Sequence, residues 1–400
     1  MSVSLSGDLR SGASDAQASA ASRPVRAGRL AGIDVARGLA VLGMLGAHLS
    51  IGENVTWAPS SWLAVVEGRP SILFAVLAGV SIALMSGGAR PATGEALVRA
   101  RTRILVRAAW VFAIGGVLEF FNDWVAIILG VYAVLFVLAL PVLRWPPVRL
   151  FVLAGGVAVL GPPLCLLLAQ VATSTQWDAG QPFIVLMFTG AYPATVWVAF
   201  VFTGLGLGRL DLRAPRMPGR LLVVGTLLAV VGYTGGWLTT LAFAGPGSAV
   251  GLDEGMDQLG RWDLAWLSGA QPHTGTTFEL VGSTGVAIAV LGLCLIVAAR
   301  APRLVYPLAS VGAMALTMYS VQIVLIWLGG DDGPLGAGVW LLASALTLVV
   351  ATLWRLLWAQ GPLERMLAWS ARLASEPRPA AAPPPVVLEA DGRPEPAGVR

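Results

Sequence analysis

The stretch GIDVARGLAVLGMLGAHLS, residues 32–50, decides the fold class of this chain. It is almost entirely apolar and long enough to cross a hydrocarbon core of about 30 Å as an α-helix. Its ionisable side chains are Asp34, Arg37 and His48. Because ionisable groups are costly inside a bilayer, we interpret the stretch as a transmembrane helix and these side chains as functional candidates.

Similar apolar segments recur along the chain. The 400 residues are 56% hydrophobic and 12% charged, with a mean hydropathy of +0.76, whereas soluble domains are about 25% charged. The segments cover residues 33–51, 70–87, 104–121, 124–143, 148–170, 183–208, 221–244, 276–299, 304–328 and 335–358. We therefore predict an all-α polytopic membrane protein, a bundle of about ten transmembrane helices.

The connections between these segments alternate in charge. One set is rich in arginine, as in 88–103 and 209–220, and the other is acidic, as in 52–69 and 245–275. The positive-inside rule places the arginine-rich set in the cytoplasm, and arginines near both ends of the chain place both termini there as well. The excess of 26 basic over 22 acidic residues thus reflects topology, and we expect the lipid bilayer and no nucleic acid as a partner.

The two ends of the chain differ from its apolar middle. Residues 1–28 are rich in Ser, Ala and Gly and lack the apolar core of a signal peptide, which predicts a disordered cytoplasmic tail. Residues 371–400 are rich in Pro and Ala and predict a second disordered cytoplasmic tail. Residues 29–370 then form a single transmembrane domain.

Arg37 and His48 share one face of the first predicted helix. They are eleven residues apart, about three turns, and are separated by about 16 Å along the axis. The topology puts Arg37 near the cytoplasmic edge and His48 near the outer edge. In one interpretation Arg37 is an orientation anchor paired with Asp34, and His48 is an interfacial residue. In the other, both face a polar cavity, which their common face favours.

The second histidine of the chain, His273, lies at the outer entrance to the segment 276–299, with Glu279 just inside it. The topology puts both at the outer depth of His48. A histidine beside a carboxylate is suited to act as a general base near neutral pH. The alternative is a solvated loop histidine beside a glutamate that snorkels to the interface.

Two other polar sites lie at the apolar segments. Glu119, at the outer end of the third segment, either lines the same outer vestibule or marks the interface. Tyr319, Ser320 and Gln322 form a patch in the ninth segment, which contacts substrate or, as is more usual in membrane helices, hydrogen-bonds a neighbouring helix.

Arg99, Arg101 and Arg103, followed by Arg107, form a basic cluster on the predicted cytoplasmic side. Such a cluster holds the phosphates of a coenzyme or of anionic lipid, or it reflects only the positive-inside bias. The two cysteines lie in apolar segments, and the sequence contains no zinc-ligand spacing, phosphate-binding glycine loop or nucleophile elbow. We therefore expect no metal.

At these residues the chain resembles the membrane-embedded acyltransferases, whose first span carries an Asp, an Arg-Gly pair and, in many members, a histidine ten intervening residues later. Here these are Asp34, Arg37-Gly38 and His48. The amino-acid sequences of residues 29–49 and of GRPSILFAVLAGVSIAL (68–84) most resemble those of bacterial YeiB-like proteins and of the catalytic domain of heparan-α-glucosaminide N-acetyltransferase. PHTGTTFELVGSTG (272–285) and GAMALTMYSVQ (312–322) resemble the C-terminal region of YeiB-like proteins.

The resemblance implies transfer of an acyl group, commonly acetyl, from cytoplasmic acyl-CoA to an acceptor across a bacterial cytoplasmic membrane. Arg37 would lie near the donor, and His48 would act in acyl transfer. The animal enzyme carries its active histidine in the loop after the first span, whereas this loop, GENVTWAPSSW, has none.

Our leading hypothesis is an acyl-CoA-dependent O- or N-acyltransferase that modifies an extracytoplasmic glycan or envelope component. His48, aided by His273 or Glu279, would be catalytic. Arg37 with Asp34, and the cluster of Arg99, Arg101 and Arg103, would hold acetyl-CoA as the donor. The alternative is a transporter or exporter component for a small solute, since YeiB-like proteins are associated with transport. A scaffold without ligand is a third reading.

Overall fold

A computed structural model of the protein describes residues 30–49, 67–121, 125–174, 182–243, 264–330 and 336–376, and every regular element in these ranges is helical. The elements are α2 (Ala31–His48), α3 (Arg69–Met85), α4 (Gly94–Phe120), α5 (Leu129–Ala139), α6 (Pro147–Ser174), α7 (Pro182–Ile184), η2 (Val185–Thr189), α8 (Ala194–Gly208), α9 (Met217–Phe243), η4 (Leu264–Leu267), α10 (Thr277–Arg300), α11 (Tyr306–Ala313), α12 (Ala315–Gly329), α13 (Gly336–Trp358) and α14 (Pro362–Ser375). The predicted all-α class is confirmed.

Each of the ten apolar segments falls on a helix or on a bent pair of helices. Four helices, α6, α9, α10 and α13, are long and apolar enough to cross a bilayer. The pairs 182–189 with α8, bent by 53°, and α11 with α12, bent by 82°, raise the number to six if each pair is one span. The other four segments are shorter, as α3 and α5 are, or carry charged side chains, as α2 and α4 do. The chain is a multi-pass membrane protein.

The C-terminal part of the chain departs from the predicted boundaries. The helix α14 runs to Ser375, past the boundary predicted between 370 and 371, and packs against α4. Its Leu367 and Ala371 are buried, whereas Trp369 and Leu373 are exposed. An amphipathic helix of this kind is missed by a search for long apolar segments. The rest of both predicted tails lies outside the described residues.

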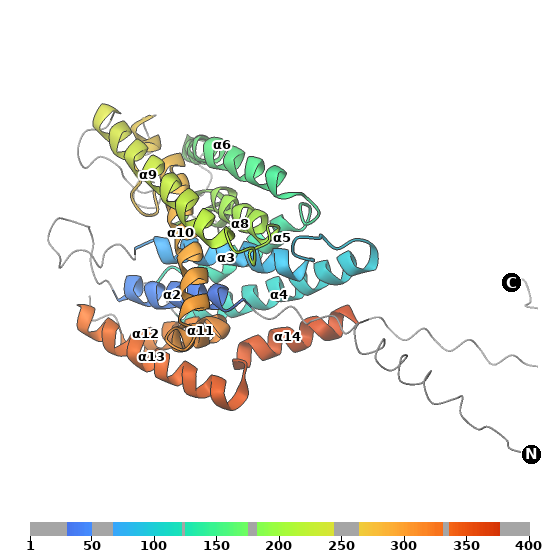
Figure 1. The fold of residues 1–400 in the computed structure, drawn as a ribbon. Helices are drawn as coiled ribbons and strands as arrows, with labels where there is room; N and C mark the ends of the chain where they lie inside the picture. The colour runs from blue at the N-terminus through green and yellow to red at the C-terminus, as the bar shows by residue number, and fades with distance from the viewer. Residues whose placement is uncertain are drawn as a thin grey trace, which may run out of the picture.

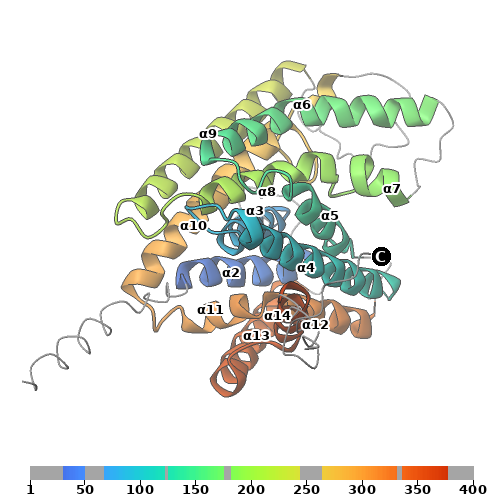
Figure 2. The same cartoon turned by 90° about the vertical axis from the view of Figure 1, so that its right-hand side faces the viewer.

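The helices α2 and α3 lie at the centre of the molecule, with α6 and α9 to one side and α13 to the other (Figures 1 and 2). The contact of α3 with α8 depends on Gly79 and Gly204, because a Cβ on either would overlap a backbone carbonyl of the other helix, that of Val201 or Val76. Small residues allow membrane helices to approach this closely.

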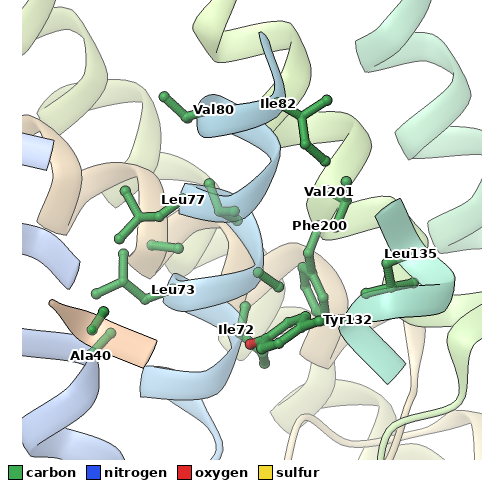
Figure 3. Packing of buried hydrophobic residues seen from close by; sticks show 14 of the residues in the cluster. Ala40, Ile72, Leu73, Leu77, Val80, Ile82, Tyr132, Leu135, Phe200 and Val201 are labelled. Atoms are coloured by element: carbon green, nitrogen blue, oxygen red, sulfur yellow. The ribbon is translucent and has the colours of Figure 1, made fainter. Parts of the chain in front are cut away.

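Buried apolar side chains pack together where α3, α5 and α8 meet (Figure 3). The Tyr132 ring of α5 lies beside Ile72 of α3 and Phe200 of α8 (Figure 3). The Tyr132 hydroxyl donates a hydrogen bond of 2.8 Å to the carbonyl oxygen of Ser71. This tyrosine, 2% exposed, therefore fixes α5 to the N-terminal half of α3.

The broken helix pair α11–α12 packs directly on α2. A Cβ at Gly312 would overlap the carbonyl oxygen of Asp34, and one at Gly38 would overlap that of Leu308. The Gly38 of the Arg-Gly pair thus has a packing role. Where α12 starts after the 82° bend, the Glu364 carboxylate accepts hydrogen bonds from the backbone N–H of Thr317 at 3.0 Å and from its hydroxyl at 2.6 Å. The carboxylate satisfies a backbone donor that the break leaves free.

The outer helices α9 and α13 face the surroundings with aliphatic and aromatic side chains. In the 18-residue apolar stretch of each helix, only 22% of α9 and 6% of α13 is buried inside the protein. Apolar side chains that are exposed along whole turns of a helix indicate contact with lipid. The bilayer therefore solvates these two helices.

Candidate functional site

Arg37 is held in place by two side chains. Its guanidinium donates to Asp34 Oδ1 at 2.8 Å, one turn before it, and to Ser81 Oγ of α3 at 2.7 Å. It lines a cavity of about 290 Å³, the Arg37 cavity, together with residues of α3, α4, α5, α11, α12 and α14. It also borders a second cavity of about 560 Å³ at the connection between α8 and α9. The positive charge of Arg37 is therefore held in a fixed position next to two cavities.

The basic cluster of α4 is divided by the fold. Arg99 forms an ion pair with Glu95 at the surface, Arg101 is exposed, and Arg103 donates to Ser375 Oγ of α14 at 2.9 Å. None of the three lines the Arg37 cavity. Arg107 does, and its Nε has no hydrogen-bond partner within the part of the chain that the structure describes.

At the other end of α2, His48 and His273 line one small cavity of about 140 Å³, the His48 cavity. The two histidines, more than 200 positions apart in the sequence, are brought together here. The wall also contains Glu67, Ser71, Tyr192 and Tyr319 among other residues. A site with two imidazoles and two phenols offers several groups that accept or donate a proton.

Each histidine is oriented by a tyrosine ring. His48 lies edge-on to Tyr319, with ring centroids 6.1 Å apart, and His273 lies edge-on to Tyr192 at 5.4 Å. The Nδ1 atoms of both histidines are buried and have no hydrogen-bond partner among the described residues. An unsatisfied polar atom that is buried costs free energy unless a ligand or water meets it.

The position of His273 is set by Glu279. The buried carboxylate of Glu279 accepts from the backbone N–H of His273 at 2.8 Å, from that of Gly275 at 2.6 Å and from the Thr274 hydroxyl at 3.3 Å. His273 has a φ of +64°, which is uncommon for a residue other than glycine. No hydrogen bond joins the carboxylate to the imidazole of His273 in the described structure. Glu279 contacts the backbone of the turn, whereas the sequence suggested a partner for the ring.

The two cavities are separated by a thin wall. Ser71 of α3 faces the His48 cavity, and Phe74, Ala78 and Ser81, at spacings of three or four residues on the same helix, face the Arg37 cavity. Tyr132 lies at the junction, with its ring 5.5 Å from that of Phe74 and its hydroxyl on the Ser71 carbonyl. One face of α3 therefore connects the two ends of the site.

Several lining residues were not among the candidates that the sequence suggested. Tyr192 precedes Pro193, where the chain bends by 53°, and it lines the His48 cavity. Glu67 was counted only as part of the acidic connection 52–69, and nothing in the sequence around Ser71 suggested a functional role. Glu119, by contrast, is exposed and lines neither cavity.

Among families of known proteins, the profile of the heparan-alpha-glucosaminide N-acetyltransferase catalytic domain matches residues 29–233, just over half of the 400 residues. The match contains α2 with Arg37 and His48 and ends within α9, before His273 and Glu279. No curated protein matches the chain with significance. The chain belongs to the family of the heparan-alpha-glucosaminide N-acetyltransferase catalytic domain, a family of membrane N-acetyltransferases.

Proposed function

We propose that the protein transfers an acetyl group from cytoplasmic acetyl-CoA to a hydroxyl or amine of an extracytoplasmic acceptor. The observation that carries the proposal is the placement of a cavity at each end of one face of α2, with Arg37 at one end and His48 at the other. The positive-inside rule, applied to the arginine-rich connections, supports a cytoplasmic position for the Arg37 end, where acyl-CoA is available.

At the Arg37 end, the anionic donor is held by arginine side chains. Arg37 is fixed by Asp34 and Ser81, and Arg107 lines the same cavity with an Nε that has no hydrogen-bond partner among the described residues. Guanidinium groups bind phosphate oxygens through charge-assisted hydrogen bonds. Arg107 thereby takes the role expected for Arg99, Arg101 and Arg103, which contribute only to the general positive charge of this side.

The thioester of the donor passes from the Arg37 cavity along the wall at Tyr132 to the His48 end, where it reacts with the acceptor. The imidazole of His48 takes the proton of the acceptor's hydroxyl or amine as a C–O or C–N bond forms and the C–S bond breaks. The proton then goes to the sulfur of the leaving coenzyme. In a two-step variant, the acetyl group rests on His48 before the acceptor takes it. His273 assists from the same cavity, and Glu279 positions it through the turn.

Inside-out membrane vesicles from cells that produce the protein test this function. Labelled acetyl-CoA added to the exposed cytoplasmic face is expected to give labelled product in the lumen, whereas right-side-out vesicles, whose Arg37 end is inaccessible, give none. Vesicles that carry His48→Ala are the control. Absence of label in either orientation, combined with uptake of a solute without acetyl-CoA, would favour the transporter alternative.

A further inference from the structure

A third space, larger than the His48 cavity, opens from it between α12 and α13. This apolar groove has a volume of about 790 Å³ and shares Ala47, His48, Ala126 and Tyr192 with the His48 cavity. The acyl-transfer step proposed above leaves it without a role. Its position makes His48 the junction between the two spaces.

The groove follows α13 for most of its length. Val339, Ala343, Leu346, Val350 and Trp354 line it at spacings of three or four residues, which places them on one face of the helix. Fifteen residues separate the first from the last, so the groove extends for about 22 Å. One leaflet of the hydrocarbon core is about 15 Å thick. The groove thus accommodates an apolar chain as long as a leaflet is deep.

The composition of the groove selects for such a chain. Among the residues that the structure describes, those that line the groove include no Asp, Glu, Lys or Arg. Leu325 of α12 and Val350 of α13 are 61% and 51% exposed, so the groove is open along its side toward lipid. A sugar or an ion would lose its hydration there without compensation, whereas a hydrocarbon chain would lose nothing.

The end of the groove at His48 is polar. Gln322, only 6% exposed, lines the groove, and its Nε2 has no hydrogen-bond partner in the part of the chain described. The unpartnered Nδ1 of His48 lies at the same end. A donor and an acceptor at the mouth of an apolar groove fit a molecule with a polar head and an apolar chain.

We propose that the acceptor is membrane-anchored: its apolar chain lies in the groove between α12 and α13, and its head group reaches His48. The inference rests on the proposed function and narrows the acceptor to lipid-linked molecules. The head group then enters from the outer leaflet, while the donor enters from the Arg37 end. The two substrates approach the same imidazole by separate routes.

Photolabelling tests the groove without any activity. The full chain in nanodiscs is exposed to a hexadecyl glucoside that carries a diazirine near the end of its chain, and labelled peptides are mapped by mass spectrometry. Label is expected on α12 and α13. Ala343→Trp fills the groove and should reduce this label by about tenfold, the equivalent of about 1.4 kcal/mol. Ala345→Trp, on the same helix but outside the groove, should leave it unchanged.

A second matched pair guards against misfolding of the first. Val350→Trp fills the groove about two turns further along α13, and Val349→Trp places the same ring in lipid. Label spread evenly over α9 and α13 would overturn the proposal. So would equal labelling of the two variants within each pair, Ala343→Trp with Ala345→Trp and Val350→Trp with Val349→Trp.

An extraction assay then identifies the class of acceptor. Purified protein is incubated with labelled acetyl-CoA and either a total membrane-lipid extract or the water-soluble fraction of the same cells. Label is expected in the organic phase. Label confined to a water-soluble acceptor would overturn the lipid anchor while supporting acetyl transfer. Transfer to neither fraction would refute the proposed function, and the photolabelling result would still decide whether the groove binds a chain.

Discussion

The two ends of α2 differ in how their polar groups are satisfied. At the Arg37 end the guanidinium is fixed by Asp34 and Ser81, and the adjoining cavities measure about 290 and 560 Å³. At the His48 end the cavity is about 140 Å³, and the Nδ1 atoms of both imidazoles find no hydrogen-bond partner among the residues that the structure describes. A group that binds a charged ligand benefits from being held rigidly, whereas a group that exchanges protons needs a free lone pair. The difference is consistent with the proposed function, in which one end binds the donor and the other carries out the chemistry.

The strongest test of this division is His48→Ala. Loss of a general base lowers kcat by about 10²- to 10⁴-fold, whereas the affinity for acetyl-CoA should stay within about twofold, because the donor is held at the other end. Steady-state transfer of label and equilibrium binding of acetyl-CoA measure the two quantities. Retained activity would remove His48 from the chemistry.

Arg37→Gln should show the opposite pattern. Loss of a charge-assisted hydrogen bond of about 1.5–3 kcal/mol weakens the binding of acetyl-CoA by about 10- to 150-fold. Arg101→Gln, at an exposed position of α4, is the matched control and should bind the donor normally. If Arg101→Gln impaired binding as much as Arg37→Gln, the basic cluster of α4 would regain the role that the sequence suggested.

Both ends depend on the contact of α11 with α2. Gly312→Ala places a Cβ against the Asp34 carbonyl oxygen and forces the helices apart, with a loss of about 1–3 kcal/mol in the free energy of unfolding. Gly329→Ala is the control, because a Cβ added there would meet no neighbouring atom within 4 Å. This substitution should be neutral or slightly stabilising. Thermal unfolding in detergent measures the difference. Equal stabilities would show that the helices separate without cost.

Two carboxylates, the buried Glu279 and the half-buried Glu364, allow the ends to be perturbed separately. Glu279→Gln disturbs the turn that carries His273 and should lower kcat by about tenfold, since a hydrogen bond to a charged group contributes about 1.5–3 kcal/mol. Glu364→Gln disturbs the start of α12 in the Arg37 cavity and should raise the KM for acetyl-CoA instead. A common loss of kcat in both variants would contradict the division between binding and chemistry.

The smallest effect is expected at the wall between the cavities. Tyr132→Phe removes the hydrogen bond to the Ser71 carbonyl, a net contribution of about 0.5–1.5 kcal/mol. A looser wall admits water to the thioester, so release of acetate without acceptor should rise about two- to tenfold. An unchanged rate of hydrolysis would indicate that the ring alone closes the wall.

Sequence periodicity and composition were sufficient for the helices and for one end of the site. Apolar segments long enough for lipid predicted every major helix except α14, because their signal is local. Arg37 and His48 were found for the same reason, since both lie on one helix and its pitch fixes their common face. Arg209, by contrast, was counted among the topological arginines, yet it is 4% exposed and donates to the Ala83, Gly88 and Leu143 carbonyls.

The remaining features depend on contacts between distant segments. The crossing of helices that are far apart in sequence brings His273 into the same cavity as His48. The same crossing places Arg107, and not Arg99, in the Arg37 cavity, with Tyr132 between the two cavities. Sequence by itself determined which segments are helical and which side chains of α2 share a face, because helix geometry is local. Only the tertiary structure decided which of the scattered polar groups meet, because glycine contacts such as Gly312 on α2 set the distances between helices.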